Sequence, residues 1–237
     1  MRLLLLGIIL ITTSKIKAQN KVTAANTNAA TAAQNIYHTT IAAKENIYNG
    51  QEYFHNNGPI IGHVFWNDNL FIKGSVGYEG NIYPNIPLKL DLLFEELVTR
   101  GSNLGIQIKI IKEKIDSFNI GGISFLHLTQ NNLHKIPTGF YEVLHNGKYS
   151  VICRRIKSIK ETVLPDGVER KIVQKNSYYL KENGVYYEIR NRQTLYNFFK
   201  NKREEVKNYI RTENLNFNKD PESFIVLSIK YLEQITQ

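Results

Sequence analysis

The stretch HNNGPIIGH, residues 55–63, places two of the six histidines eight positions apart and close to Asp68. Imidazole and carboxylate groups commonly transfer protons or bind metals, so a hydrolytic site around His55, His63 and Asp68 is one interpretation. The spacing is not that of a helical metal pair, and the chain contains no GxSxG, HExxH, P-loop, GxGxxG or CxxC motif. A hydrolase is therefore kept only as the second alternative function.

Two other groups could do chemistry. Asp91, Glu95 and Glu96 form the best acidic cluster, and Asp91 and Glu95 would converge on a helix, although such pairs are common on solvated helices. Cys153, the only cysteine, precedes two arginines that could lower its pKa, but its strand position favours a buried apolar role. We expect no catalytic residue, no metal site and no cofactor. Whether the protein is an enzyme stays open, with a non-catalytic role favoured.

Basic residues are concentrated in one half of the chain. The net charge is +9, and residues 148–219 hold seventeen Lys/Arg against eight Asp/Glu, whereas residues 20–147 hold nine against ten. In an exported protein such a surface suits anionic envelope polymers or lipid headgroups rather than nucleic acid, although it can also serve solubility alone. The cations expected to bind are Arg154, Arg155, Lys157, Lys160, Arg170 and Lys171.

Four tyrosines surround an Asn-Gly pair in SYYLKENGVYYEIRN, residues 177–191. Asn-Gly between alternating residues indicates a two-residue hairpin turn, which sets Tyr187 opposite Leu180. Tyr178 and Tyr187 then belong to the core. Tyr179 and Tyr186 fall on the other side, either facing outward, where they join the candidate binding residues, or beneath the helices that follow, which is the simpler account.

A second Asn-Gly pair occurs in GFYEVLHNGKYSVICRR, residues 139–155. The same two-residue register would set Tyr141 opposite Ile152 and Phe140 opposite Cys153. Apolar residues fall on both sides, which predicts a central hairpin covered on both faces. Beyond Cys153 the strand becomes polar, so we expect a basic ribbon that runs into solvent towards the turn at residues 165–167.

Alternation and turn pairs predict a β-rich middle of the chain. The expected strands are residues 70–78, 80–84, 87–99, 105–113, 115–120, 123–129, 139–145, 148–163, 168–182 and 185–190. Residues 87–100 could also form a helix, but their start alternates as a strand. Helical periodicity marks residues 33–48 and the chain after 191, where Asp220-Pro221-Glu222 begins a helix. The fold class is α+β: a twisted antiparallel β-meander covered by an N-terminal helix and C-terminal helices.

The first residues, MRLLLLGIILITTSKIKAQN, combine a positive start, nine apolar residues and a polar end. This pattern predicts a secretory signal peptide over residues 1–19, and nine apolar residues are too few for a spanning helix. Residues 20–33 then form a linker, and residues 34–237 a single domain. We expect export to the periplasm or the cell surface, with no transmembrane segment in the mature chain.

Three blocks carry a resemblance: GSVGYEGNIYPNIPLKLDLLFEELV, GFYEVLHNGKYSVICRRIKSI and YYLKENGVYYEIRNRQTLYNFF, followed by a helix around Tyr231-Leu232-Glu233. Over most of the mature chain they resemble uncharacterised exported proteins of Bacteroidota. The resemblance implies export and a β-rich fold, and implies no activity. The favoured function is a non-catalytic envelope or surface accessory or binding module. The first alternative is a binder of anionic envelope polymers or lipid headgroups through residues 148–219.

Overall fold

The computed structural model describes residues 46–54, 58–101, 105–130 and 136–236. The chain divides into two compact units, Met1–Asn46 and Ile47–Gln237, and only the second is described below. The predicted signal peptide and linker, and nearly all of the predicted N-terminal helix, lie outside the described residues. No helix in the described ranges is long and apolar enough to cross a membrane.

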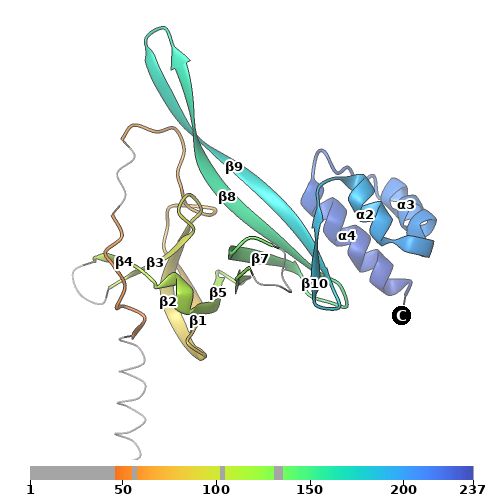
Figure 1. The fold of residues 1–237 in the computed structure, drawn as a ribbon, viewed down its shortest axis with the longest axis horizontal. Coiled ribbons are helices and arrows are strands. Elements are labelled where there is room, and N and C mark those ends of the chain that lie inside the picture. Colours follow the sequence, from red (N-terminus) through yellow and green to blue (C-terminus); the bar gives the residue numbers. More distant parts are fainter. Residues whose placement is uncertain (1–45, 55–57, 102–104, 131–135, 237) are drawn as a thin grey trace, which may run out of the picture. The chain divides into compact units, whose positions relative to one another are not determined.

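Ten strands form one sheet in which every neighbouring pair is antiparallel, in the order β10-β9-β8-β7-β6-β5-β1-β2-β3-β4. The first five are β1 (Ile72–Tyr78), β2 (Asn81–Asp91), β3 (Glu96–Arg100), β4 (Gln107–Lys109) and β5 (Ile115–Ile120). The others are β6 (Ile123–Leu128), β7 (Gly139–His145), β8 (Ser150–Leu164), β9 (Gly167–Glu182) and β10 (Val185–Ile189). The predicted antiparallel, β-rich architecture is confirmed (Figure 1).

One connection departs from a simple meander. The chain passes from β4, at one edge of the sheet, through the 3-10 helix Lys112–Lys114 to β5, which pairs with β1. The sheet is curled, so that Leu92, just after β2, lies against β8. The Leu92 carbonyl accepts a hydrogen bond from the Lys157 amide over 2.8 Å. The turn between β2 and β3 is thereby brought next to the basic part of β8.

Residues 87–99 are strands rather than a helix. A turn divides them into the end of β2 and the start of β3. Buried Asp91 stabilises that turn, because its Oδ1 accepts hydrogen bonds from the amides of Leu93 (2.7 Å) and Phe94 (3.1 Å). Glu95 completes the turn in the left-handed conformation, with φ of 53°. The local hydrogen bonds of Asp91 therefore compete with continuation of β2.

The predicted register of the β9–β10 hairpin is confirmed, with Tyr187 paired to Leu180. The predicted register of β7–β8 is wrong by two residues, since Val143 rather than Tyr141 pairs with Ile152. The loop between these strands is longer than two residues because helix α4 holds it open: Glu233 Oε1 accepts a hydrogen bond from the Tyr149 amide over 2.7 Å. A shift of two leaves each side chain on its predicted face.

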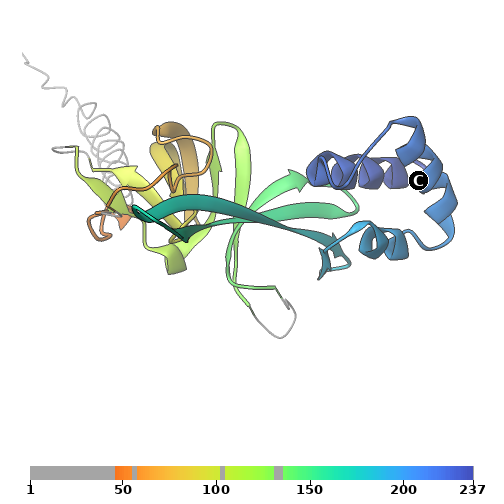
Figure 2. The same ribbon diagram turned by 90° about the horizontal axis from the view of Figure 1, so that it is seen from above.

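Three α-helices follow the sheet: α2 (Arg192–Phe198), α3 (Arg203–Thr212) and α4 (Pro221–Gln234). They gather beside β10 and the neighbouring ends of β8 and β9 (Figures 1 and 2). Asn191 caps α2 by accepting a hydrogen bond from the Thr194 amide, and Asp220 caps α4 in the same way from Ser223. The predicted start of the last helix at Asp220-Pro221 is confirmed.

The sheet carries two cores on opposite faces of β8 and β9. The helical core joins one face to the three helices, and its buried residues are Val151, Cys153, Tyr178, Leu180, Ile189, Leu195, Phe199, Val206, Ile210, Phe224, Ile225, Ile229 and Leu232. The tyrosine cluster occupies the other face, and its buried residues are Ile136, Tyr141, Ile152, Tyr179 and Tyr186. Alternate residues of each strand therefore enter different cores, as strand geometry requires.

The tyrosine assignments are partly corrected. Tyr178 is buried in the helical core as predicted, but Tyr187 is 46% exposed and is not a core residue. It lies on the edge strand β10, where Phe198 is its only ring contact among the described residues, at 6.2 Å between centroids. Tyr179 and Tyr186 are buried, but as members of the tyrosine cluster rather than under the C-terminal helices.

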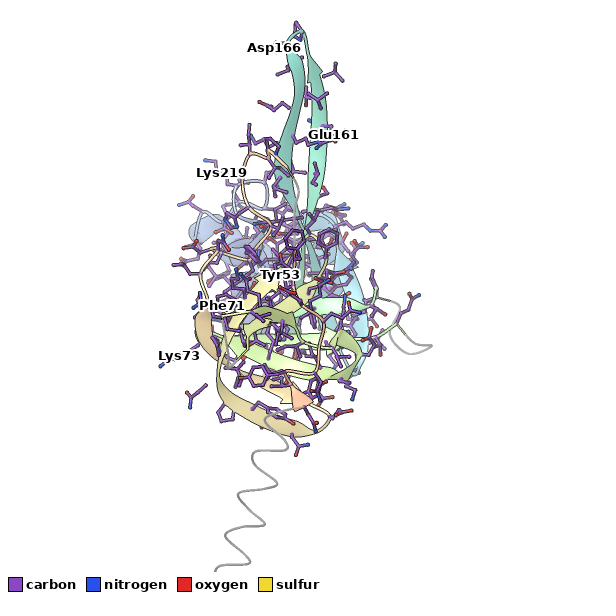
Figure 3. All side chains as sticks on the ribbon, turned by 90° about the vertical axis from the view of Figure 1, so that its left-hand side faces the viewer. Tyr53, Phe71, Lys73, Glu161, Asp166 and Lys219 are labelled. Carbon is purple, nitrogen blue, oxygen red and sulfur yellow. The ribbon has the colours of Figure 1, made fainter. Side chains whose placement is uncertain are left out.

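Two segments involve the outer part of β9: a strap that pairs with β9, and an arm formed by the outer halves of β8 and β9. The strap, residues 60–66, pairs with β9 through Ile61 and Lys171 and with β2 through Phe65 and Asp91. The arm, residues 158–176, is the hairpin end of β8 and β9, and residues 158–171 are all exposed. Figure 3 shows the arm projecting, with Asp166 near its tip. The predicted exit of this ribbon into solvent is confirmed, although it begins later than expected.

Candidate functional site

Arg154, a predicted binding residue, is occupied by an internal ion pair. Its Nε and Nη2 donate hydrogen bonds to the two oxygens of Glu95 over 3.1 and 2.7 Å, and Nη2 also reaches the Thr138 carbonyl at 3.3 Å. The curl of the sheet makes this contact, since Glu95 belongs to the turn between β2 and β3. The guanidinium therefore ties that turn to β8 instead of facing solvent.

Arg155 points to the opposite face and is held between two carboxylates. Nε donates to Glu142 Oε2 over 2.6 Å and Nη2 donates to Glu222 Oε2 over 2.7 Å. Burial alone would lower the pKa of the guanidinium, but the hydrogen bonds to both carboxylates outweigh it and raise the pKa. Arg155 thus joins β7, β8 and the first turn of α4.

Lys157 is also turned inward. Its Nζ donates hydrogen bonds to the backbone carbonyls of His63 (3.0 Å) and Phe65 (2.6 Å), so it holds the strap against β8. Burial lowers the pKa of its ammonium group, and the nearby Asp91 carboxylate offsets part of that effect. Three of the six predicted cations therefore make internal contacts rather than a binding surface.

The other three predicted cations lie on the arm. Lys160 and Lys171 are exposed and face each other across β8 and β9, while Arg170 Nε pairs with Glu161 at 2.9 Å. The arm holds four Lys/Arg against three Asp/Glu, so its charge is nearly balanced. Figure 3 shows Glu161 on its shaft and Asp166 near its tip. This composition provides little attraction for an anion at the outer end of the arm.

Tyr179 and Tyr186 complete the predicted binding set, and neither forms an open stacking platform. Tyr179 is 6% exposed, and its ring meets that of Tyr141 edge to face at 5.6 Å. Tyr186 is 9% exposed, and the Lys181 ammonium group lies 5.3 Å from its ring centroid. Both rings are therefore mostly covered by the protein itself.

The candidate catalytic groups are dispersed. His55 lies outside the described residues, while His63 and Asp68 are exposed. Asp91 caps a turn as described above, and Glu96 pairs with Lys109 at 3.0 Å. Nowhere in the described residues do three His, Cys, Asp or Glu side chains gather as metal ligands would.

Cys153 is fully buried, in agreement with the inward strand position. Burial raises the pKa of its thiol to about 12, and the Arg155 charge offsets only part of that effect. At neutral pH the sulfur is a protonated, apolar-like group of the helical core.

A different basic surface surrounds Tyr196 of α2. One hollow of about 510 Å³ lies at the junction of β10 and α2, lined by Arg190, Asn191, Arg192, Gln193, Tyr196, Phe217 and Asn218. A second hollow of about 370 Å³ lies along α3 and the loop after it, lined by Tyr196, Lys207, Ile210, Arg211, Asn214, Leu215 and Asn216. Both hollows include Tyr196, and together they are called the basic groove.

The lining of the basic groove contains four cations and no carboxylate. Arg190 pairs with Glu188 and Lys207 with Glu204 at its rim, but Arg192 and Arg211 form no ion pair with the described residues. The Lys207 ammonium and the Arg203 guanidinium lie 5.7 and 5.6 Å from the Tyr196 ring centroid. The groove therefore combines positive charge with a ring and several side-chain amides.

Sequence reasoning located the basic half of the chain but not this groove. Residues 190–219 alone hold eight Lys/Arg against three Asp/Glu, and they include six asparagines or glutamines outside the helix interiors or at their starts. That local excess was the available signal. The adjacent arginines at 154 and 155 form a denser basic pattern within one strand, which makes this more dispersed signal hard to recognise.

Comparison with known proteins adds nothing to this geometry: no family model, no curated protein and no solved structure matches the chain.

Proposed function

We propose that this protein is an exported, non-catalytic binding module that holds an anionic polysaccharide in the basic groove. The observation that carries the proposal is the lining of the groove, in which cations occur without any carboxylate. A positive hollow attracts carboxylate or sulfate groups and concentrates an anionic chain at its surface. The signal-peptide pattern of residues 1–19 supports an envelope or extracellular location.

The neutral part of the lining favours a polysaccharide over a lipid headgroup. Asn214 and Asn218 add amides that can donate to and accept from hydroxyl groups, while the amides of Asn191 and Gln193 already make hydrogen bonds within the protein. Tyr196 adds a ring at the centre of the groove, where a sugar ring can lie against it. Both hollows border Tyr196, so only a ligand that extends past this side chain would occupy both, as a polymer does.

The test measures binding of polygalacturonate, a carboxylated polysaccharide, to the full chain by isothermal titration calorimetry at low and moderate salt. We expect binding that weakens as salt rises, since exposed charges are screened. The variant Arg192→Gln/Arg211→Gln should bind about 2- to 30-fold more weakly, because each exposed ion pair contributes about 0.2–1 kcal/mol. Arg192 begins α2, so its neutralisation does not disfavour the helix.

The matched control is Lys160→Gln/Lys171→Gln, which removes the same charge from the arm. It should change the affinity less than twofold. Equal losses in the two double variants would show general charge attraction and overturn the groove assignment. Binding to phosphatidylglycerol vesicles without binding to polygalacturonate would replace the polysaccharide with a lipid surface.

A further inference from the structure

A separate polar hollow lies at the base of the arm, on the face of the sheet that carries the helical core. Its volume is about 400 Å³, and it is lined by Trp66, Asn67, Glu142, Arg155, Lys157 and Gln174. Four elements contribute: the end of the strap, β7, β8 and β9. Lys157 and Gln174 are direct partners in the register of β8 and β9, so they stand side by side at its outer rim.

The charges around the polar hollow are balanced. Arg155 is neutralised by Glu142 and Glu222, and the Lys157 ammonium is held by two backbone carbonyls. This hollow differs in that respect from the basic groove, whose lining has no carboxylate. A ligand that carries net charge would gain little here and would lose its hydration.

The unused hydrogen-bonding capacity of the hollow is both accepting and donating. Glu142 is 7% exposed; its Oε2 accepts from Trp66 Nε1 (3.3 Å) and Arg155 Nε (2.6 Å). Its Oε1 accepts no hydrogen bond from any described residue and is not sealed from solvent. Asn67 and Gln174 add exposed side-chain amides at the rim, although Gln174 Nε2 already donates one hydrogen bond to Asn176 Oδ1 over 2.9 Å.

Trp66 is the aromatic residue in the lining of the polar hollow. Phe125 contacts the indole edge to face at 5.3 Å between centroids, and the hydrogen bond to Glu142 fixes its orientation. Trp66 forms part of the wall of the hollow, which is mostly polar. The indole is therefore held next to the polar groups of the hollow.

We propose that the polar hollow binds one residue of a neutral saccharide, whose hydroxyls hydrogen-bond to Glu142, Gln174 and Asn67 beside Trp66. A polyhydroxylated, uncharged ring supplies both donors and acceptors and brings no net charge, which matches the balanced charge and the mostly polar wall described above. The volume is within the range of small-ligand sites. This site is independent of the basic groove.

The experiment uses Trp66 as its own reporter, because it is the only tryptophan of the chain. Its fluorescence is recorded while glucose, galactose, mannose, N-acetylglucosamine, cellobiose and lactose are added separately to the full protein, to about 100 mM, which detects millimolar affinity. We expect a saturable change with at least one of these sugars. The absence of a saturable change with every one of them overturns the proposal.

Two rim variants keep the reporter and test the contacts. Gln174→Ala and Asn67→Gly should each weaken the affinity for the responding sugar about 3- to 10-fold, the effect of losing one hydrogen bond. Asn67 already has a φ of 59°, so glycine suits its backbone. Lys171→Gln, an exposed change outside the hollow, should leave the titration unchanged. Unaltered affinity in both rim variants would place the sugar elsewhere and refute the site.

Two further comparisons fix the ligand class and separate this site from the proposed function. The responding sugar should bind at least as tightly as its uronic acid, and a tenfold preference for the acid would refute a neutral ligand. Arg192→Gln/Arg211→Gln should leave the Trp66 titration unchanged even though it weakens polygalacturonate binding. Loss of the Trp66 signal in that variant would refute an independent site, whereas polygalacturonate binding without any Trp66 response would leave the groove standing alone.

Discussion

At the scale of single residues, the surroundings of a cation decide its role more than its type does. Arg155 and Arg170 are both ion-paired arginines of the same hairpin. The Arg155 side chain is 13% exposed and its partner Glu142 is 9% exposed, whereas Arg170 and Glu161 are 45% and 57% exposed. A charge that loses a buried partner cannot recover its hydration, but an exposed one can.

Arg155→Ala should therefore lower the free energy of unfolding by about 3–5 kcal/mol, because the Glu142 carboxylate is left buried without its cation. Arg170→Ala, the matched control on the arm, should cost about 0–1 kcal/mol. Urea unfolding followed by circular dichroism measures both. A loss under 1 kcal/mol for Arg155→Ala would mean that water reaches Glu142 and replaces the guanidinium.

At the scale of elements, β8 and β9 change character along their length. Near Cys153 and Tyr178 they lie between the two cores, whereas residues 158–171 are exposed throughout. The ladder of hydrogen bonds between the strands continues to the tip at Leu164 and Gly167. Backbone pairing and exposed side-chain contacts such as the Arg170–Glu161 ion pair therefore hold the outer arm, and apolar burial holds the inner part.

This difference predicts a gradient of hydrogen exchange along the hairpin. The amides of residues 159–168 should exchange at least about 100-fold faster than those of residues 151–153, because local opening of the arm exposes little apolar surface. Amide exchange followed by NMR at neutral pH measures this. Uniform protection over both stretches would show that the arm unfolds only together with the cores.

At the scale of the molecule, several acidic groups are buried in their neutral forms. Burial raises the pKa of the tyrosines Tyr53, Tyr78, Tyr141, Tyr178 and Tyr179. It also raises that of the Cys153 thiol from its usual 9.0 to about 12. The unfolded chain ionises these groups at lower pH than the folded protein does, so alkaline conditions favour unfolding.

The free energy of unfolding should stay level up to about pH 9 and fall above it. Stability falls with rising pH because the folded-state pKa of each group is raised. The stabilisation is complete below the unfolded-state pKa and is lost as the pH rises through the folded-state pKa. Each group contributes about 1.4 kcal/mol per pH unit within its window. Urea titrations at several pH values measure the slope. Cys153→Ala should make it shallower between about pH 9 and pH 12, and an unchanged slope would contradict a buried thiol.

The bounds of some strands and the register of one hairpin could be predicted from residues that are close together in the sequence. β5 and β7 have the predicted bounds, and β9–β10 pairs as its Asn-Gly turn requires, because a two-residue turn leaves a single register. The β7–β8 register was wrong although the same pair of residues suggested it. There, Glu233 of α4 binds the Tyr149 amide, and a partner 84 residues away cannot be read from the turn.

The candidate sites show the same division. The alternating faces of the hairpins, the start of the last helix at Asp220 and the basic character of residues 148–219 can be read from the chain, because each depends on neighbours in sequence. That Arg154, Arg155 and Lys157 face inward, and that Arg192 and Arg211 line neighbouring hollows, depends on contacts between distant segments. The carboxylates that pair with Arg154 and Arg155 belong to other elements. The curl of the sheet brings Glu95 to Arg154, and the packing of α4 brings Glu222 to Arg155.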